Sequence, residues 1–258
     1  MKPASYLESH RTHDYPFLVR RWRAVARKAG LEMRPLVTQT PEHKLFAVKS
    51  KRLGKSDGIY ISAGIHGDEP AGSEALIVWA EQNVNRLARL PLLIFPCLNP
   101  WGLTNNRRVD QNGHDLNRQF HLDLPLIRAV KKLTEPHRFA LALTLHEDFD
   151  GQGLYLYEVE RATPYWGEDL LNIARPIIAI EGRILIDGRR ASAGIVRRKV
   201  TLKKFAEIGL PEAVWLHLNH STRTFTIETP SEFSLDRRVQ AHIAIIDECV
   251  RRASAEHF

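Results

Sequence analysis

The chain of 258 residues is 43% hydrophobic, which is enough to bury one large core. Its net charge of +7 comes from dispersed arginine pairs without a nucleic-acid-binding motif, and attraction of a small anionic substrate explains them equally well. We therefore expect no nucleic-acid partner. The absence of any apolar run of about 18 residues excludes a membrane-spanning helix and predicts no membrane partner.

The N-terminal residues and the cysteines bear on location. No apolar segment typical of a signal peptide occurs near Met1, and Cys97 and Cys249 match no metal-binding spacing. We expect a cytoplasmic protein whose thiols are reduced and buried. Because no linker or internal repeat divides the chain, we also expect one domain over 1–258, in which 1–40 supply an N-terminal helix and an edge extension.

The first third of the chain alternates between helical and extended patterns. Apolar residues at helical spacing predict a helix over 14–29 that ends at Gly30. Two extended segments, near 31–38 and 44–49, predict an antiparallel edge of a sheet. The remaining elements expected in this part are a strand over 58–63, a helix over 71–83 and a buried strand over 92–96.

The rest of the chain continues this alternation. Residues 97–120 lack periodicity and are dense in Asn, Arg, Asp and Gly, which predicts an ordered functional loop. The pattern is weakest over 183–222, where only a helix near 200–208 is indicated. The other expected elements are a helix over 124–133, strands over 139–145 and 154–157, a helix over 166–181 interrupted at Pro176, a strand over 223–227, and a final helix capped by Ser231. This alternation predicts an α/β fold.

A candidate half-site for a metal lies in the turn Gly64-Ile-His-Gly-Asp-Glu69. His66 and Glu69 follow the C-terminal end of a predicted strand, which is where open α/β sheets place their ligands. An imidazole and a carboxylate three residues apart can bind the same cation, and Zn²⁺ accepts both. A capped helix start would explain the same residues, so this pattern alone does not decide between the two interpretations.

Two other predicted strands end in residues that complete such a site. His146 follows the strand over 139–145, and Glu228 follows the strand over 223–227. Two histidines and one carboxylate form the ligand set of an open catalytic zinc, which leaves a further position for water. We therefore expect His66, Glu69 and His146 to bind one Zn²⁺ ion.

These residues resemble the motifs of the M14 zinc metallocarboxypeptidases, from about residue 58 to residue 230. Within the resemblance, the turn at 64–69 and Pro96-Cys-Leu-Asn-Pro100 are most similar to short bacterial members related to murein peptide amidase. Succinylglutamate desuccinylase and aspartoacylase form a related branch. The motifs are His66-x-x-Glu69, Arg108, Gly113-x-Asp115-Leu-Asn117-Arg118, His146, and Phe225-Thr-Ile-Glu228-Thr.

The resemblance implies a zinc carboxypeptidase-like fold, with a mixed, mostly parallel twisted sheet and helices on both faces. It also implies hydrolysis of the C-terminal amide bond of a short peptide by metal-activated water, with Glu228 as general base. Arg108 would stabilise the oxyanion, and Asn117 and Arg118 would bind the free carboxylate of the substrate. Asp115 would hold the far nitrogen of the ligand His66.

The sequence departs from the family pattern at two positions. Digestive carboxypeptidases supply a tyrosine from a mobile loop, but no tyrosine occurs over 183–227. That role is therefore either absent or filled differently, with Tyr155 and Tyr157 as the candidates. Asp148 stands where such enzymes often carry an aromatic residue. Together with the arginines at 189–198 in the presumed specificity loop, it suggests a charged or zwitterionic end group, such as that of a peptide ending in a diamino acid. Glu147 is the next candidate for the base if Glu228 is not.

Three functions remain open at this point. The leading one is a peptidase or amidase, with a cell-wall (murein) peptide as one candidate substrate. The alternative is an N-acyl-amino-acid deacylase of the succinylglutamate desuccinylase/aspartoacylase type. In both cases the partner is a small peptide or acylated amino acid with a free carboxylate. A binding protein on the same scaffold would have lost a ligand or the base, and none is missing here.

Overall fold

The computed structural model describes residues 11, 13–55, 57–159, 163–200, 205 and 208–257. In this part of the chain, no helix is both long and apolar enough to cross a membrane. The helices are α1 (Tyr15–Ala29), α2 (Pro70–Gln82), α3 (Val84–Leu87), α4 (Pro100–Asn105), α5 (Pro125–Thr134), α6 (Gly167–Ala174), α7 (Glu212–Asn219) and α8 (Leu235–His257), with a 3-10 turn, η2 (Leu116–Arg118). The strands are β1 (Glu32–Thr40), β2 (His43–Lys49), β3 (Gly58–Ala63), β4 (Leu92–Phe95), β5 (Phe139–Asp148), β6 (Tyr155–Val159), β7 (Leu185–Ile186), β8 (Arg189–Arg190), β9 (Ile195–Arg198) and β10 (Ser221–Pro230).

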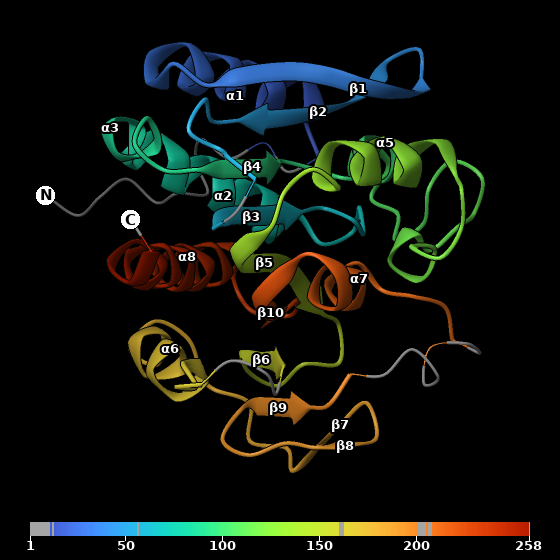
Figure 1. The fold of residues 1–258 in the computed structure, drawn as a ribbon. Coiled ribbons are helices and arrows are strands. Elements are labelled where there is room, and N and C mark those ends of the chain that lie inside the picture. The colour runs from blue at the N-terminus through green and yellow to red at the C-terminus, as the bar shows by residue number, and fades with distance from the viewer. Residues whose placement is uncertain are drawn as a thin grey trace, which may run out of the picture.

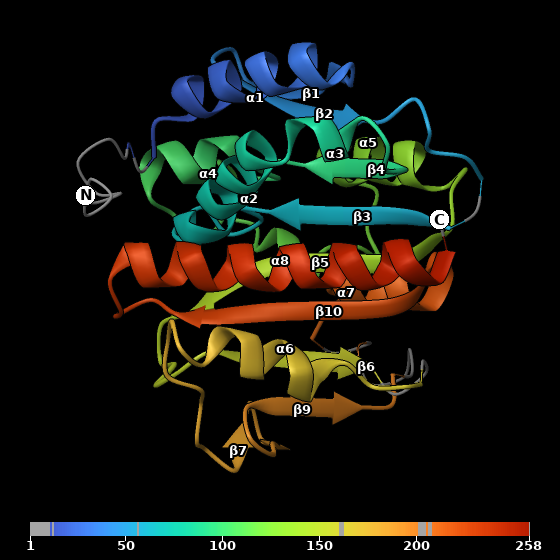
Figure 2. The ribbon, with the colours of Figure 1, turned by 90° about the vertical axis from the view of Figure 1, so that its left-hand side faces the viewer.

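One eight-stranded sheet organises these elements, in the order β1-β2-β4-β3-β5-β10-β6-β9 (Figures 1 and 2). The pairs β4-β3, β3-β5, β5-β10 and β6-β9 are parallel, and the other three are antiparallel. The short strands β7 and β8 form a separate antiparallel hairpin. The predicted mixed, mostly parallel sheet is therefore confirmed, with β1 and β2 forming its antiparallel edge.

Alternating strand residues divide the core between the two faces of the sheet. On one face, Ile61 and Leu143 pack with the helices α1, α2, α6 and α8. On the other face, Tyr60 packs with α5 and α7. Helices thus cover both sides of the sheet, as predicted. The same alternation places His146 and Glu228 on the α7 face, because Leu145 and Ile227, one residue earlier in each strand, belong to the first core.

The N-terminal helix and most of the strands lie where the sequence predicts them. Helix α1 begins after Asp14, whose carboxylate accepts a hydrogen bond from the Phe17 amide, and it ends at Gly30 in a left-handed conformation. Both cysteines are buried, and burial raises the pKa of Cys97 to about 12, so this thiol stays protonated at neutral pH.

Several local predictions were wrong. Helix α6 ends at Ala174, which confirms the predicted interruption at Pro176, but the helix does not resume between Pro176 and residue 181. Helix α8 begins at Leu235, so Ser231 does not cap it and lies in a turn closed by Phe233 N and Pro230 O. Helices α4 and α7 were not predicted. Most of the helix expected near 200–208 lies outside the described residues.

Candidate metal centre

The turn after β3 is shaped by two glycines. Gly64 has a φ of 62°, a backbone angle that residues other than glycine rarely adopt. A Cβ atom on Gly67 would lie 1.9 Å from the carbonyl carbon of Gly102 in α4, so only glycine allows this approach. The Gly67 amide donates a hydrogen bond of 3.0 Å to the carbonyl of Arg107. The turn that carries His66 is therefore joined to the segment that carries Arg108.

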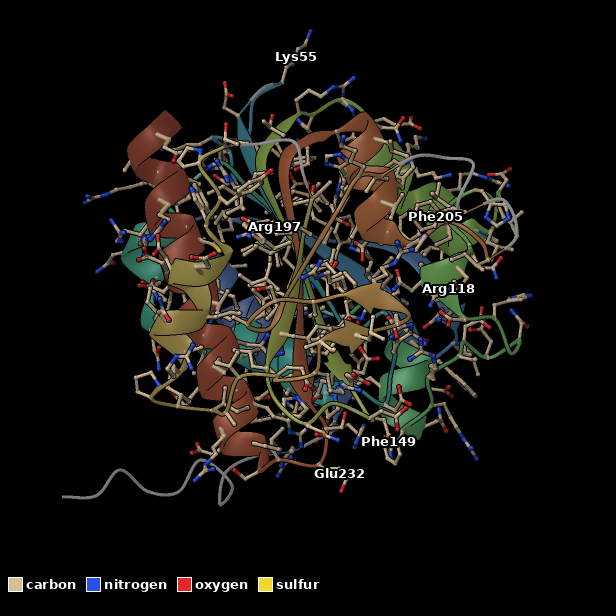
Figure 3. The ribbon with its side chains drawn as sticks, turned by 90° about the horizontal axis from the view of Figure 1, so that it is seen from below. Lys55, Arg118, Phe149, Arg197, Phe205 and Glu232 are labelled. Carbon is tan, nitrogen blue, oxygen red and sulfur yellow. The ribbon has the colours of Figure 1, made fainter. Side chains whose placement is uncertain are left out.

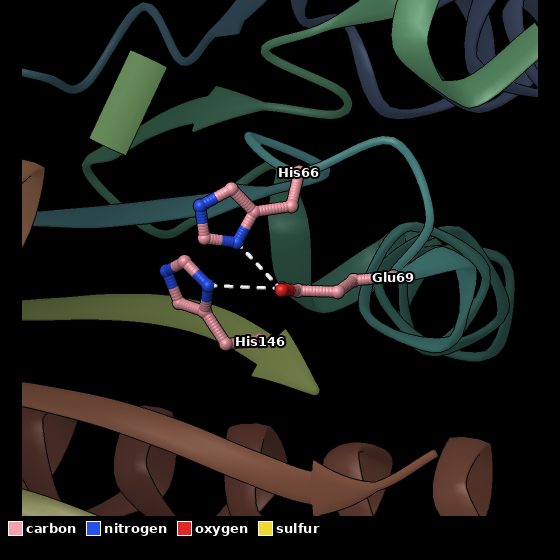
Figure 4. A group of neighbouring side chains, drawn as sticks. All are labelled: His66, Glu69 and His146. Carbon is pink, nitrogen blue, oxygen red and sulfur yellow. Dashed lines mark hydrogen bonds and ion pairs between the residues drawn. The ribbon is translucent and has the colours of Figure 1, made fainter. Parts of the chain in front are cut away.

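His66, Glu69 and His146 form a compact buried cluster at the ends of β3 and β5 (Figure 4). One carboxylate oxygen of Glu69 lies 2.6 Å from Nδ1 of His66, and the other lies 3.0 Å from Nδ1 of His146. The potential ligand atoms all lie within 4.8 Å of one another, and the three residues are between 2% and 5% exposed. Two imidazole nitrogens and one carboxylate that converge in this way can bind a single metal ion.

The electrostatics of the cluster favour a bound cation. Burial alone would lower the pKa of His66, but the carboxylates of Glu69 and Asp115 raise it to about 9. Burial would raise the pKa of Glu69, yet His66 and His146 hold it well below its ordinary value. The Glu69 carboxylate therefore stays ionised between His66 and His146. A proton or a metal ion at this point can be shared by the carboxylate and the two imidazoles.

Asp115 and Arg108 surround the cluster. An oxygen of Asp115 lies 3.1 Å from Nε2 of His66, so it fixes the ring and its tautomer, as expected for a residue that supports a ligand. Arg108 donates to Asp115 and to Glu69, at 3.3 Å in each case. Its side chain is still 45% exposed, so the guanidinium lies between the buried cluster and the open cavity.

A cavity of about 340 Å³ opens above the cluster, and Glu228 lies in its wall. Glu228 faces His146 across the paired strands β5 and β10. Burial raises the pKa of Glu228 to about 8, with a further contribution from the negative charges of Glu69, Asp148 and Asp187, while His146 acts in the opposite direction. A carboxyl group with a pKa near neutrality, beside a candidate metal site, has the properties of a general base.

Asn117 and Arg118 line the same cavity from the 3-10 turn η2. The side-chain oxygen of Asn117 accepts a hydrogen bond of 3.0 Å from the backbone amide of Glu212, so the opposite end of the amide carries the donors. The backbone of Arg118 is held by Leu210, whose amide donates to the Arg118 carbonyl at 3.0 Å. Figure 3 shows Arg118 on the same side of the molecule as Phe205, which also lines the cavity.

The chain is similar to known proteins in sequence over part of its length and in fold over most of it. Residues 55–157 match the family of the succinylglutamate desuccinylase/aspartoacylase catalytic domain. No curated protein sequence matches the chain. A structure from Shewanella denitrificans, described as a candidate metallopeptidase, has a TM-score of 0.84 at 20% identity and covers 97% of this chain and 95% of its own.

Two carboxypeptidases of known structure are also similar. The metallo-carboxypeptidase from Pseudomonas aeruginosa, in complex with (2-guanidinoethylmercapto)succinic acid, has a TM-score of 0.62 at 18% identity over 92% of this chain and 68% of that one. Carboxypeptidase A from Helicoverpa armigera has a TM-score of 0.63 at 13% identity over 96% and 74%. The chain has a carboxypeptidase-like fold. The predicted ligands, base and carboxylate-binding residues all meet at one cavity of that fold.

Glu147, the alternative base, makes its side-chain contacts on the other face of the sheet. Because it follows His146 in strand β5, its side chain points to the opposite face of the sheet. Its carboxylate accepts a hydrogen bond of 2.8 Å from the Ala71 amide, at the start of α2, and an ion pair joins it to Arg238 of α8. The Glu147 amide in turn donates to Glu69 at 3.1 Å. This residue supports the cluster and does not compete with Glu228.

The two tyrosines that could replace the family tyrosine both line the cavity, and each is hydrogen-bonded to an acid. Tyr155 donates to Asp148 at 3.0 Å, and Tyr157 donates to Asp187 at 2.5 Å. Asp148 is also paired with Arg183 at 3.3 Å. Arg183 also pairs with Glu181, at 2.8 Å, so one cation serves two acids. The role of Asp148 in substrate selection stays a prediction.

The sequence interpretation placed the arginines at 189–198 in the presumed specificity loop, and Arg189 lines the cavity. It missed the other residues that the segment 183–213 contributes to the cavity, which include Asp187, Ile208 and Ala213. One signal was present, because Asp187-Gly188 is a typical dipeptide of a two-residue hairpin turn. Which cavity that turn would enter could not be inferred from the sequence, since the contact depends on the packing of the hairpin against β6.

Proposed function

We propose that the protein is a metal-dependent hydrolase that cleaves an amide bond next to a free carboxylate. The observation that supports this most strongly is the buried cluster of His66, Glu69 and His146, with Glu228 and Arg108 in the wall of the same cavity. A structural role alone would not require two buried imidazoles around one ionised carboxylate at an open cavity. The donor set fits Zn²⁺, and we propose one zinc ion as the cofactor.

When bound, Zn²⁺ supplies a Lewis acid that polarises the scissile carbonyl and makes water more acidic. Glu228 accepts the proton of the attacking water and returns it to the leaving amine. Arg108, half-exposed at the cavity, stabilises the negative charge that develops on the carbonyl oxygen. Asn117 and Arg118 orient the substrate by its carboxylate, which suits the planar guanidinium of an arginine.

The favoured substrate is a short peptide that loses its C-terminal residue, as in the zinc carboxypeptidases. A cell-wall (murein) peptide is the specific candidate, because the motifs resemble those of murein peptide amidase. Two features support a peptidase: the carboxypeptidase-like fold and the metallopeptidase description of the Shewanella denitrificans structure.

The second candidate is an N-acyl-amino-acid deacylase. The observation in its favour is the match of residues 55–157 to the succinylglutamate desuccinylase/aspartoacylase catalytic domain. Both reactions break an amide bond beside a free carboxylate, so both make the same use of Glu228, Arg108 and Arg118. They differ in whether the acyl part is a peptide or a simple acid.

Product analysis by mass spectrometry separates the two candidates. Zinc-loaded protein is incubated with one mixture of free-acid peptides, their C-terminal amides, a γ-linked cell-wall tripeptide and N-acyl amino acids. We expect loss of one C-terminal residue from the free-acid peptides but not from their amides. Cleavage of only the N-acyl amino acids would assign the deacylase activity instead, and no cleavage of any compound would contradict the proposal.

A further inference from the structure

A second group of largely buried polar side chains lies behind the metal cluster, on the opposite face of the sheet. It consists of Glu147 in β5, Thr229 in β10, and Arg238 and His242 in α8. Helix α8 packs against both strands and against α2, and Figure 2 shows it running alongside β10. Because the neighbouring core between α2 and α8 is apolar, these polar groups must satisfy one another.

One carboxylate, that of Glu147, contacts the three segments that carry the metal ligands and the base. It accepts a hydrogen bond of 2.8 Å from the Ala71 amide at the start of α2, just after the turn that holds two of the ligands. It accepts a longer one, of 3.5 Å, from the hydroxyl of Thr229, which follows the base Glu228 in β10. The third segment is β5 itself, in which Glu147 follows His146. The positions of the ligands and of the base therefore depend on the same side chain.

Arg238 supplies a counter-charge for this carboxylate. Its guanidinium forms an ion pair with Glu147, and its Nε atom donates a hydrogen bond of 2.9 Å to the carbonyl of Phe233, which fixes the plane of the guanidinium. Both side chains of the pair are shielded from water, so solvent compensates little of either charge. Without the arginine, a buried carboxylate would remain unpaired close to the ionised Glu69.

His242 lies one helical turn after Arg238, on the same face of α8. Its Nε2 atom is 3.2 Å from the hydroxyl oxygen of Thr229. Because that hydroxyl uses its only hydrogen to reach Glu147, it accepts a hydrogen bond from His242. Two side chains of one helix therefore hold the strand ends that carry a ligand and the base.

We propose that Arg238 is a positioning residue of the metal centre, which fixes the ends of β5 and β10 and the start of α2 through Glu147. This inference rests on the proposed function, because it takes His66, Glu69 and His146 as the metal ligands. Arg238 does not line the cavity, so it acts on the ligands and the base through the residues that it holds. Its loss should therefore reduce metal affinity and turnover more than substrate binding.

Zinc affinity tests the inference without any turnover. Competition with a chromophoric chelator gives the dissociation constant of Arg238→Met, which we expect to be about 10- to 100-fold weaker than that of the wild type. The exposed neighbour Arg237 provides the matched control as Arg237→Met, which should bind zinc like the wild type. Wild-type affinity in Arg238→Met would overturn the inference and leave the proposed function standing. A wild type that binds no zinc would contradict both.

A second variant separates positioning from a loss of stability. Arg238→Met alone leaves Glu147 charged and unpaired, which destabilises the fold as well as the site. The double variant Glu147→Gln/Arg238→Met leaves no unpaired buried charge, and its folding is checked by urea unfolding. We expect its zinc affinity to stay at least about tenfold below that of the wild type, and Arg238→Lys, which keeps the charge, to recover part of the loss. Wild-type zinc affinity in the double variant would show that the pair serves stability alone.

The geometry of the site can be followed with cobalt(II), whose d–d absorption depends on the number and arrangement of its ligands. We expect the double variant to change this spectrum and Arg237→Met to leave it as in the wild type. In the zinc-loaded enzyme, the double variant should lower kcat by about tenfold with little change in KM. Reduced zinc affinity and a changed spectrum support the inference even if no amide bond is cleaved, whereas an unchanged spectrum contradicts it.

Discussion

At the scale of single residues, the site depends on where each polar side chain is directed. Glu69 is the central residue, because its two oxygens contact both histidines while Arg108 and the Glu147 amide approach from outside. Each contact favours the ionised carboxylate. A cation held here is consequently bound by a charged ligand whose orientation is already fixed.

Replacing His66 with alanine should remove one ligand and expose the remaining two to water. Loss of a supporting residue typically weakens metal binding by about 10- to 100-fold, and loss of a ligand should exceed that range. The measurement is zinc content after dialysis against a buffered chelator. His114→Ala is the control, since the ion pair of this histidine among the described residues is with Asp110, outside the cluster. Full zinc retention by His66→Ala would refute the ligand assignment.

Glu228→Gln tests the base without changing the size of the side chain. We expect bound zinc to be retained and kcat to fall by at least about 10²-fold, because the amide cannot accept the proton of water. The exposed Glu232, just beyond β10, provides a control as Glu232→Gln (Figure 3). Near-normal turnover of Glu228→Gln would mean that another group is the base.

At the scale of elements, the segment before α7 positions the carboxylate-binding residues. Gly209 has a φ of 80°, and a Cβ atom on it would lie 2.2 Å from the carbonyl oxygen of Arg118. The adjacent Leu210 amide donates to that same oxygen, and the Glu212 amide at the start of α7 holds Asn117. Two backbone amides thus fix both residues that we propose for carboxylate binding.

Gly209→Ala should displace the Arg118 backbone and so raise KM for free-acid substrates. Gly30→Ala is a suitable control, because Gly30 has a similar φ of 66° but a Cβ atom on it would meet no atom within 4 Å. Both variants should lose about 1 kcal/mol of stability through backbone strain. Only Gly209→Ala should also increase KM, by several-fold. The same KM in both variants would show that the contact with Arg118 is unimportant for binding.

Some of the elements could be predicted from sequence patterns and others could not. Strand ends and the turn at His66 were predictable, because alternating apolar residues and a glycine-rich turn are local signals. The positions of helix α7 and of the β7-β8 hairpin were not predictable, since they depend on contacts with Asn117 and Tyr157, far away in the sequence. The separation of His146 from its neighbour Glu147 also required the sheet, because β5 extends to Asp148 and includes both residues.

At the scale of the whole molecule, buried histidines make stability depend on pH. His137 and His220 lie near each other, away from the metal cluster, and are 7% and 8% exposed. Burial lowers the pKa of each, with a further contribution from Lys49 for His137 and from Arg138 for His220, while hydrogen bonds to Gly54 and His137 carbonyls act in the opposite direction. Both rings are therefore neutral in the folded protein at neutral pH.

The lowered pKa values of His137 and His220 determine whether stability rises or falls with pH. Because the unfolded pKa of histidine is about 6.5, unfolding takes up protons below that pH, so the stability that these residues contribute is present above it and is lost as the pH falls. The double variant His137→Gln/His220→Gln should flatten this dependence, by up to about 1.4 kcal/mol per pH unit for each histidine. Urea unfolding between about pH 5 and 7 measures the slope. Parallel slopes for the two proteins would contradict the prediction.

Because His146 lies within a paired strand, the length of that strand restricts how this protein can evolve. Leu145 pairs with Ala63 on one side, and His146 pairs with Glu228 on the other, so the ligand and the base keep a fixed register. Losing one residue from β5 would turn Glu147 toward the cavity and His146 toward α2 and α8. Loops around the site can lengthen or shorten without this effect. New specificities should therefore arise from insertions in the loops, while the strands that carry the ligand and the base keep their length.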